Sequence, residues 1–319
     1  MVTELTLLRF IIYAVSVVVL FLAALAVFSP LTLLNALAWR DTKSVVTKNL
    51  SYGNDVRQKL DIYSPAHTEV PPDVVVFFYG GNWDSGSRKQ YGFVGKALAS
   101  RGIMTVVADY RLSPQVVYPA FVEDAAHAVA WTLKHIGEYG GNASKVFVAG
   151  HSAGAYNAAM VALDPRWLEE YGESPAALQG WVGIAGPYDF LPIDVESIKP
   201  TFLYPNTPAD SQPIRHVTAA APPSLLITGS ADKVVNPVRN SAGLAAALRA
   251  VQVPVQTVSL DGVGHGLLVG AFAPLLRSYL PVLDDVSAFV FRTSAAQRRE
   301  DEVGRGHYAV HTGVPPVSR

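Results

Sequence analysis

The stretch VFVAGHSAGAYNAAMVAL, residues 146–163, joins a short β-branched run to a helix-like segment through a Gly-x-Ser-x-Gly turn. In a strand-turn-helix unit of this kind, the turn raises a serine hydroxyl above the sheet. Its glycines are required because side chains there would clash with the neighbouring strand and helix. A bare Gly-x-Ser-x-Gly also arises by chance, as a glycine-rich turn with an idle serine. The strand-like and helix-like flanks favour Ser152 as a nucleophile.

Short apolar runs, most of them β-branched or aromatic, recur on both sides of this motif and are separated by helix-length segments. This alternation predicts an α/β protein with a mostly parallel sheet covered by helices on both faces. Helical spacing is clearest at residues 121–135 and 241–250. The strand-like runs are residues 44–46, 59–63, 74–79, 104–110, 146–149, 181–184, 224–228 and 255–260.

A serine hydroxyl becomes a good nucleophile only when a base removes its proton, and the base needs an acid that holds its tautomer. In this type of fold the partners follow in the order Ser, acid, His. His265 stands in a glycine-flanked turn directly after a strand-like run, and Asp232 follows the preceding one. Both places are at the carboxyl edge of the predicted sheet, where such folds collect their active groups. We therefore expect a Ser152, Asp232 and His265 triad.

Other residues could in principle take these two roles. His216 has no strand before it and is expected to lie in a surface or lid segment. Asp189 and Asp261 compete with Asp232, but Asp261 is too near His265 in sequence to approach it from another strand. Asp232 could also be a simple turn or helix-capping aspartate.

An oxyanion intermediate needs backbone N–H donors aimed at its negative charge. The segment YGGNW, residues 79–83, leaves a predicted strand and offers unhindered amides at Gly81 and Asn82. With the amide of Ala153, these would complete an oxyanion hole.

The segments YGGNW (residues 79–83), DYRL (109–112) and GHSAG (150–154), in this order, resemble the esterase side of the hormone-sensitive-lipase and carboxylesterase group. That group includes kynurenine-formamidase-like and feruloyl-esterase-like hydrolases, and the resemblance extends over about residues 45–291. It implies the α/β-hydrolase fold. One departure is visible, because the family usually places histidine where this chain has Tyr79. In the family that histidine mainly braces the oxyanion loop. The tyrosine therefore affects the expected support of this loop more than the expected catalytic chemistry.

The resemblance implies a serine hydrolase that cleaves carboxylic esters, such as short-chain or aryl esters, through an acyl-enzyme. It also implies that the segment around Tyr188 shapes the substrate pocket, to which we assign Trp83 and His151 as well. An amide hydrolase with the same triad, such as an aryl formamidase or peptidase, remains an alternative. A membrane-tethered binding protein without turnover is a third possibility, because a fold does not guarantee a function.

Composition excludes several other classes. A net charge of −1 and the lack of a basic stripe with interleaved aromatics argue against nucleic acid as a partner. With no cysteine, disulfides, thiolate metal sites and a cysteine nucleophile are excluded. His307 and His311 are four residues apart, but in a segment with glycine and proline where no helix is expected. We therefore predict no metal and no cofactor.

Residues 10–28 form a nearly continuous apolar run whose helical length matches the ~30 Å core of a bilayer. We expect an N-terminal transmembrane helix that anchors the protein as a single span, with the side of the membrane left open. A cleaved export signal is the alternative, since alanine patterns typical of cleavage occur at residues 24–26 and 36–38. A core helix is disfavoured because core helices seldom stay apolar on every face.

The predicted organisation begins with this anchor or signal segment, residues 1–29, and a linker, residues 30–43. The catalytic domain follows at residues 44–292. Within it, residues 187–223 are rich in Pro, Asp and Thr without clear periodicity, and they form a possible cap. The polar end, residues 293–319, is expected to be a flexible tail.

Overall fold

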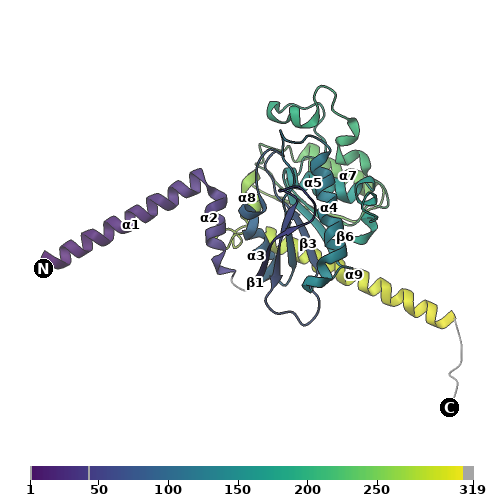
Figure 1. Cartoon of the computed structure of the whole chain (residues 1–319), viewed down its shortest axis with the longest axis horizontal. Coiled ribbons are helices and arrows are strands. Elements are labelled where there is room, and N and C mark those ends of the chain that lie inside the picture. The colour runs from purple at the N-terminus through teal and green to yellow at the C-terminus, as the bar shows by residue number, and fades with distance from the viewer. Residues whose placement is uncertain (1, 42–43, 312–319) are drawn as a thin grey trace, which may run out of the picture.

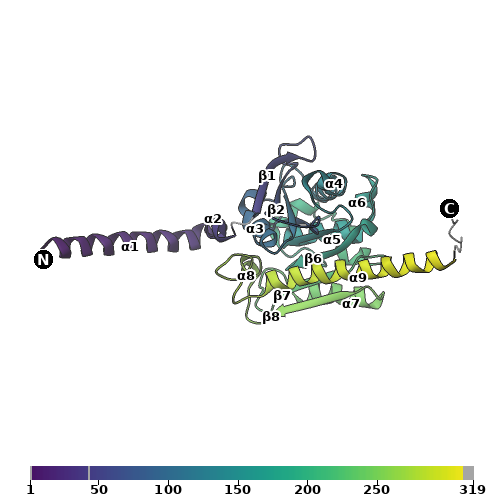
Figure 2. The same cartoon turned by 90° about the horizontal axis from the view of Figure 1, so that it is seen from below.

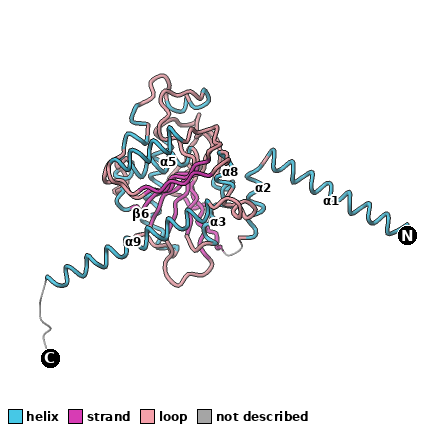
Figure 3. Tube along the Cα trace, turned by 180° about the vertical axis from the view of Figure 1, so that it is seen from behind, coloured by secondary structure: helices cyan, strands magenta, loops and turns pink. Residues whose placement is uncertain are grey.

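A computed structural model describes residues 2–41 and 44–311. Eight strands form a single sheet in the order β1-β2-β4-β3-β5-β6-β7-β8. The pairs that involve β1 and β2 are antiparallel, and all other pairs are parallel. Figure 3 shows these strands as a twisted central layer surrounded by helices. The strands are β1 Ser44–Ser51, β2 Lys59–Pro65, β3 Val74–Phe78, β4 Met104–Ala108, β5 Val146–His151, β6 Leu178–Ile184, β7 Ser224–Gly229 and β8 Val255–Leu260.

Every residue of β3, β4, β5 and β7 is buried, as expected for parallel strands that are covered on both faces. Helices α4 and α5 pack on one face of the sheet, and α3 and α9 pack on the other. The predicted mostly parallel sheet with helices on both faces is confirmed. The helices are α1 Val2–Phe28, α2 Pro30–Leu37, α3 Gly92–Ser100, α4 Ala120–His135, α5 Ala153–Leu163, α6 Arg166–Glu169, α7 Gly243–Ala250, α8 His265–Gly270 and α9 Val282–His311.

The N-terminal segment departs from the sequence-based prediction. Residues 2–28 are indeed helical and project from the body as α1, with exposed side chains from residue 6 to residue 20 (Figure 1). A membrane span needs about 20 predominantly apolar residues in one helix. Over residues 2–41 and 44–311, no helix meets the length and apolarity that such a crossing requires. The predicted transmembrane helix and single-span membrane anchor are therefore corrected.

The predicted linker is largely helical and is held against the body. After α2 comes a short 3₁₀ turn, Ala38–Arg40, while residues 42 and 43 lie outside the described part. Asn35 accepts a hydrogen bond from the main-chain N–H of Phe93 at 2.9 Å. Asp41 forms an ion pair with Arg277 at 2.5 Å. These contacts fix the segment that sequence reasoning treated as a connector.

The C-terminal segment also differs from its prediction as a flexible tail. Helix α9 continues to His311 and includes His307, and it extends beyond the sheet as a long rod (Figure 2). Soon after residue 292 comes AAQRRE, residues 295–300, in which every residue is a good helix former. The remainder of the predicted tail, residues 312–319, lies outside the described residues.

Residues 187–223, the possible cap, contain four short 3₁₀ turns and no longer helix or strand. The turns are Glu196–Ile198, Pro200–Phe202, Ala209–Ser211 and Pro213–His216. Phe202 is fully buried and contacts the rings of Trp83 and Phe121 edge-to-face, with centroids 4.8 and 5.6 Å away. This apolar contact holds the segment over the sheet without regular helical spacing.

Candidate active site

Ser152 lies at the sharp turn between β5 and α5. Its φ of 55° is unusual for a residue with a side chain, and strain of this kind persists only where the surroundings impose it. A Cβ at Gly150 would lie 2.1 Å from the carbonyl oxygen of Gly154. A Cβ at Gly154 would lie 2.1 Å from that of Phe78 in β3. Only glycines allow the turn to close this tightly.

The structure brings Ser152, His265 and Asp232 together from three separate segments. His265 begins α8, and its Nε2 lies 2.9 Å from Ser152 Oγ. Its Nδ1 lies 2.7 Å from Asp232 Oδ2. The other carboxylate oxygen, Asp232 Oδ1, accepts main-chain hydrogen bonds from Val234 and Val235 at 2.8 and 3.0 Å. With its side chain only 1% exposed, Asp232 is held in a single orientation toward the imidazole.

The predicted oxyanion loop follows β3 and has an unusual backbone. Gly81, Asn82 and Trp83 all have positive φ, at 133°, 49° and 60°. Asn82 and Ala153 both line a cavity beside Ser152. Within residues 2–41 and 44–311, no hydrogen bond uses the main-chain N–H of either residue. Gly81 is not among the residues that line the cavity, and its carbonyl closes the turn by accepting from Asp84 and Ser85.

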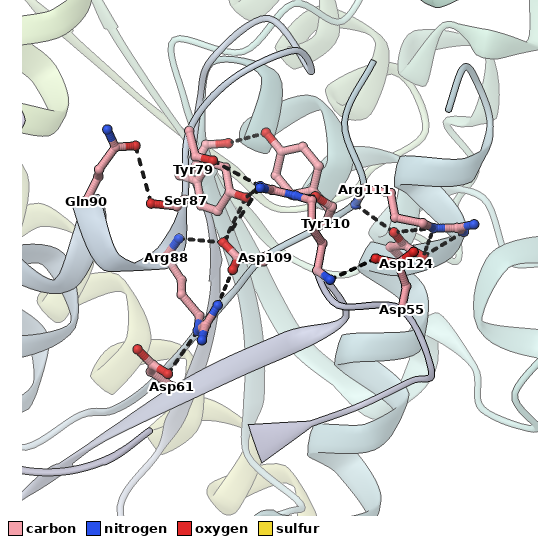
Figure 4. Close-up of polar contacts among 12 residues, drawn as sticks. Asp55, Asp61, Tyr79, Ser87, Arg88, Gln90, Asp109, Tyr110, Arg111 and Asp124 are labelled. Carbon is pink, nitrogen blue, oxygen red and sulfur yellow. Dashed lines mark hydrogen bonds and ion pairs between the residues drawn. The ribbon is translucent and has the colours of Figure 1, made fainter. Parts of the chain in front are cut away.

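Tyr79, at the position where the resemblance implies histidine, anchors this loop from behind. Its hydroxyl donates to Asp109 Oδ1 at 2.9 Å and accepts from the Arg57 guanidinium at 2.7 Å (Figure 4). Asp109 is buried and also forms an ion pair with Arg88. Burial, and then the charge of Asp109, raise the pKa of Tyr79, so the phenol keeps the proton that it donates.

The same network reaches both ends of the loop. At its start, the hydroxyl of Tyr110 donates to the carbonyl oxygen of Tyr79 at 2.8 Å. At its end, Arg57 donates to the carbonyl oxygen of Gly86 at 3.0 Å. Tyrosine therefore connects the loop to a buried ionic network, although by different atoms from those that a histidine would use.

The cavity beside Ser152 has a volume of about 220 Å³ and is mostly apolar. Trp83, which we assigned to the pocket, lines it and is fixed by an indole N–H bond to Asn157 at 3.1 Å. Pro187 and Asp189, from the segment that was expected to shape the pocket, also line it. Sequence reasoning missed the other lining residues, which come from the cap, from the loop after Asp232 and from the π-helical turn Val238–Ala242. They are Phe190, Ile193, Asp194, Val195, Ile198, Val234, Val235, Asn236, Arg239 and Asn240. The sequence held one indication that residues 234–236 line the cavity, because they follow closely after the predicted acid Asp232.

The other two residues assigned to the pocket lie elsewhere. Tyr188 is fully buried and packs edge-to-face on Trp181, with ring centroids 5.9 Å apart, and it does not line the cavity. His151 is buried beneath the site, with its ring centroid 4.9 Å from that of His265. It does not line the cavity either.

The competing candidates for the acid and the base contact residues outside the triad. His216 Nε2 is 2.6 Å from the carbonyl oxygen of Asp210, in the cap. Asp261 accepts from the hydroxyl of Ser230 at 2.8 Å. Asp189 lies at the cavity and pairs with Arg239 at 3.4 Å. None of the three is hydrogen-bonded to Ser152 or His265 in the part of the chain that the structure describes.

Among the described residues, no group of three or more His, Asp or Glu side chains is placed to hold a metal ion. The site itself presents a hydrogen-bonded serine, histidine and aspartate beside the main-chain N–H groups of Asn82 and Ala153.

The burial of His151 predicts a pH-dependent stability. Burial, and then the proximity of His265, lower the pKa of His151 to about 3, against about 6.5 for an unfolded histidine. Between these values the unfolded chain binds the extra proton, so the free energy of unfolding falls as the pH drops from about 6.5 toward 3. The slope is up to about 1.4 kcal/mol per pH unit. Urea unfolding of the wild type and of His151→Gln at pH 7, 6 and 5 measures this contribution.

The variant should lose less stability on acidification than the wild type. His67→Gln, which changes an exposed histidine, should keep the wild-type slope because it leaves His151 in place. Equal slopes for the wild type and His151→Gln would show that His151 is protonated as easily in the folded chain as in the unfolded one.

Comparison with known proteins places the fold and the site in context. Residues 60–248 match the BD-FAE family. Esterase LipC of Mycobacterium tuberculosis is 33% identical over 256 residues, covering 73% of this chain and 63% of its own. A probable isoprenylcysteine alpha-carbonyl methylesterase, ICMEL1 of Arabidopsis thaliana, is 27% identical over 69% of this chain and 51% of its own. This chain thus spans less than two thirds of the length of these relatives.

Solved structures agree on the fold. An inhibited esterase B from Lactobacillus rhamnosis superimposes with a TM-score of 0.70 at 20% identity, over 83% of this chain and 95% of that one. The resemblance to the esterase side of the hormone-sensitive-lipase and carboxylesterase group is confirmed by these relatives. The chain belongs to the BD-FAE family and has the α/β-hydrolase fold.

Proposed function

We propose that this protein is a serine hydrolase that cleaves carboxylic esters through an acyl-enzyme, with residues 44–292 as its catalytic unit. The observation that carries the proposal is the hydrogen-bonded chain from Ser152 Oγ through His265 to Asp232, with distances of 2.9 and 2.7 Å. Three residues that are distant in sequence meet in the geometry that general-base activation of a serine requires. The esterase relatives support the same class of reaction.

In the first half of the reaction, His265 Nε2 takes the proton of Ser152 as Oγ attacks the ester carbonyl carbon. The resulting oxyanion accepts hydrogen bonds from the main-chain N–H groups of Ala153 and of the Gly81 and Asn82 segment. Asp232 stabilises the imidazolium and holds its tautomer. Collapse of the intermediate breaks the bond to the alcohol oxygen, which leaves with the proton from His265.

In the second half, water takes the place of the alcohol. His265 removes a proton from the water, whose oxygen attacks the acyl carbonyl bound to Ser152. As the second tetrahedral intermediate collapses, its bond to Ser152 Oγ breaks, His265 gives its proton to Oγ, and the carboxylic acid is released. His265 passes on the proton that it accepts within each half-reaction, so the enzyme is regenerated.

The cavity argues for a small acyl group. Its volume of about 220 Å³ is below the range of roughly 300–1,000 Å³ that is usual for drug-sized ligands. It touches Ser152, Asn82 and Ala153 but is not lined by His265, which must face the leaving alcohol. We assign the cavity to the acyl side, bounded by apolar side chains such as Ile193 and Ile198 of the cap.

An assay of nitrophenyl acetate, butyrate, octanoate and palmitate beside an aryl formamide tests this proposal. We expect the highest kcat/KM for the short esters and a steep fall for octanoate and palmitate, because longer chains exceed the cavity. Ser152→Ala provides the blank. Faster cleavage of the formamide than of every ester would make the protein an amide hydrolase. Absence of turnover on all five substrates would indicate a protein without catalysis.

A further inference from the structure

His151 is a buried, titratable side chain that the proposed reaction does not use. It occupies the elbow position directly before Ser152, at the end of β5, and is 5% exposed. One ring nitrogen, Nε2, lies 3.2 Å from the main-chain carbonyl oxygen of His265. The other, Nδ1, is buried without a hydrogen-bond partner in the part of the chain that the structure describes. An apolar side chain of similar size would fill this buried place without leaving a ring nitrogen unpartnered, so the polar ring of His151 calls for an explanation.

The contacts of His151 determine its tautomer. Burial lowers the pKa of His151 to about 3, so the ring is neutral at ordinary pH and carries a single N–H. Since a carbonyl oxygen can only accept, the proton lies on Nε2 and is donated to His265. The unpartnered Nδ1 is then an acceptor without a donor, which is unfavourable in a buried site. Among the described residues, the hydrogen bond from Nε2 is the one polar interaction that the ring makes.

The segment that receives this hydrogen bond has little rigidity of its own. His265 lies between Gly264 and Gly266 and begins a helix of only six residues. Glycines leave the backbone many accessible conformations, so the position of the imidazole depends on contacts from outside the segment. One such contact joins Ala231 to Val263 through their main chains at 3.1 Å. The imidazole of His265 contacts Asp232 and Ser152, and among the described residues the His151 bond is the one side-chain contact to the main chain of His265.

On its other side, the ring of His151 is confined by the oxyanion loop. A Cβ at Gly80 would lie 3.0 Å from His151 Nδ1 and 2.9 Å from Ser152 Cβ. The ring therefore lies between the start of the oxyanion loop and the loop that carries the base. The ring has little room to shift, and His151 directly precedes the nucleophile Ser152 in the chain.

We propose that His151 is a positioning residue, whose Nε2–H holds the main-chain carbonyl of His265 and so keeps the catalytic imidazole over Ser152. The inference rests on the proposed function, because it assigns His151 a role in the same serine-histidine chemistry. His151 does not touch substrate. It acts only through the backbone of His265.

Two substitutions of similar length separate the hydrogen bond from the volume. In His151→Gln the side-chain amide nitrogen is the same number of bonds from Cβ as Nε2 of histidine, so a donor is kept. His151→Met has nearly the same length and no donor. We expect kcat to stay within a few-fold of wild type for Gln and to fall by about 10- to 100-fold for Met. KM should be nearly unchanged, because the defect is a misplaced base and not a lost substrate contact.

His127→Met is the matched control, because His127 is a half-buried histidine of α4 whose ring stacks on Tyr171, with no hydrogen bond to the triad among the described residues. It should leave kcat unchanged. The rate of phosphonylation by a fluorophosphonate is the second readout, since it also requires the serine and its base but no ester turnover. It should fall for His151→Met in parallel with kcat.

These readouts separate a failure of the proposed ester hydrolysis from a failure of the positioning role of His151. If the wild type cleaves no ester but His151→Met still slows phosphonylation, the proposed function fails and the positioning role stands. Phosphonylation and kcat of folded His151→Met at the wild-type level would overturn the positioning role. If the Met variant does not fold, His151→Asn replaces it, because its amide is one bond too short to reach His265. Equal rates for Asn and Gln would then overturn the inference.

Discussion

Turnover of a short nitrophenyl ester is expected to fall by about 10⁴- to 10⁶-fold when Ser152 is replaced by alanine. The hydroxyl oxygen forms the acyl bond, and within the described part of the chain its one side-chain partner is His265 Nε2 at 2.9 Å. The substitution removes a single oxygen and leaves the Cβ, so the strained turn at φ 55° meets the same steric conditions. Initial rates of the purified variant at saturating ester measure the loss.

Ser144→Ala is the control for this experiment, because Ser144 lies in an exposed turn and bonds to Asn142. It should retain wild-type turnover. Thermal unfolding of both variants should give melting temperatures close to that of the wild type. Ester hydrolysis by Ser152→Ala above a small residual level would show that another residue is the nucleophile.

Loss of the base should be nearly as severe. His265→Ala is expected to lower kcat about as far as the serine variant, because members of a triad act as a unit. Asp232→Asn should lose up to about 10⁴-fold, since an amide can donate to Nδ1 and favour the wrong tautomer of His265. The two main-chain bonds to Asp232 Oδ1 can persist in the asparagine variant, so the fold should be kept.

Two matched variants test whether these losses are specific. His216→Ala changes a histidine whose bond is to Asp210 in the cap. Asp261→Asn changes a carboxylate bonded to Ser230, also at the carboxyl edge of the sheet. Both should retain kcat within a few-fold. If His216→Ala were as damaging as His265→Ala, the choice of base would be wrong.

The sheet and the meeting of the triad could be anticipated from the sequence because both depend on local signals. Strands appear in the sequence as short runs that are mostly apolar, and all eight predicted runs fall on strands of the sheet. The carboxyl ends of neighbouring parallel strands share one edge, so residues directly after β5, β7 and β8 must come close together. Ser152, Asp232 and His265 occupy those places. Their catalytic roles remain predictions until the variants are measured.

Other features depend on tertiary contacts that a sequence pattern does not carry. The cap residues that line the cavity lie on irregular 3₁₀ turns, where neither period of two nor period of 3.6 applies. Tyr188 was assigned to the pocket, but packing against Trp181 turns its ring into the core. His151 was also assigned to the pocket, but it does not line the cavity. Its neighbours in space, Gly80 and His265, are distant in sequence, so the sequence could not reveal this placement.

The predictions for the two ends of the chain failed for a different reason. An apolar run of bilayer length led to the prediction of a transmembrane helix, but no helix of the described residues is long and apolar enough to cross a membrane. At the other end, charge and glycine led to the prediction of a tail, whereas helix α9 continues as far as His311. In both cases composition alone was too weak a guide.

Identification of the residue labelled by a fluorophosphonate tests the central claim most directly. The probe reacts with an activated serine whatever ester the enzyme prefers, so the measurement does not depend on the choice of substrate. Peptide mass spectrometry after labelling of the full chain should place the adduct on Ser152, and neither Ser152→Ala nor His265→Ala should be labelled at a comparable rate. An adduct on another residue, or no adduct on the folded wild type, would contradict the account.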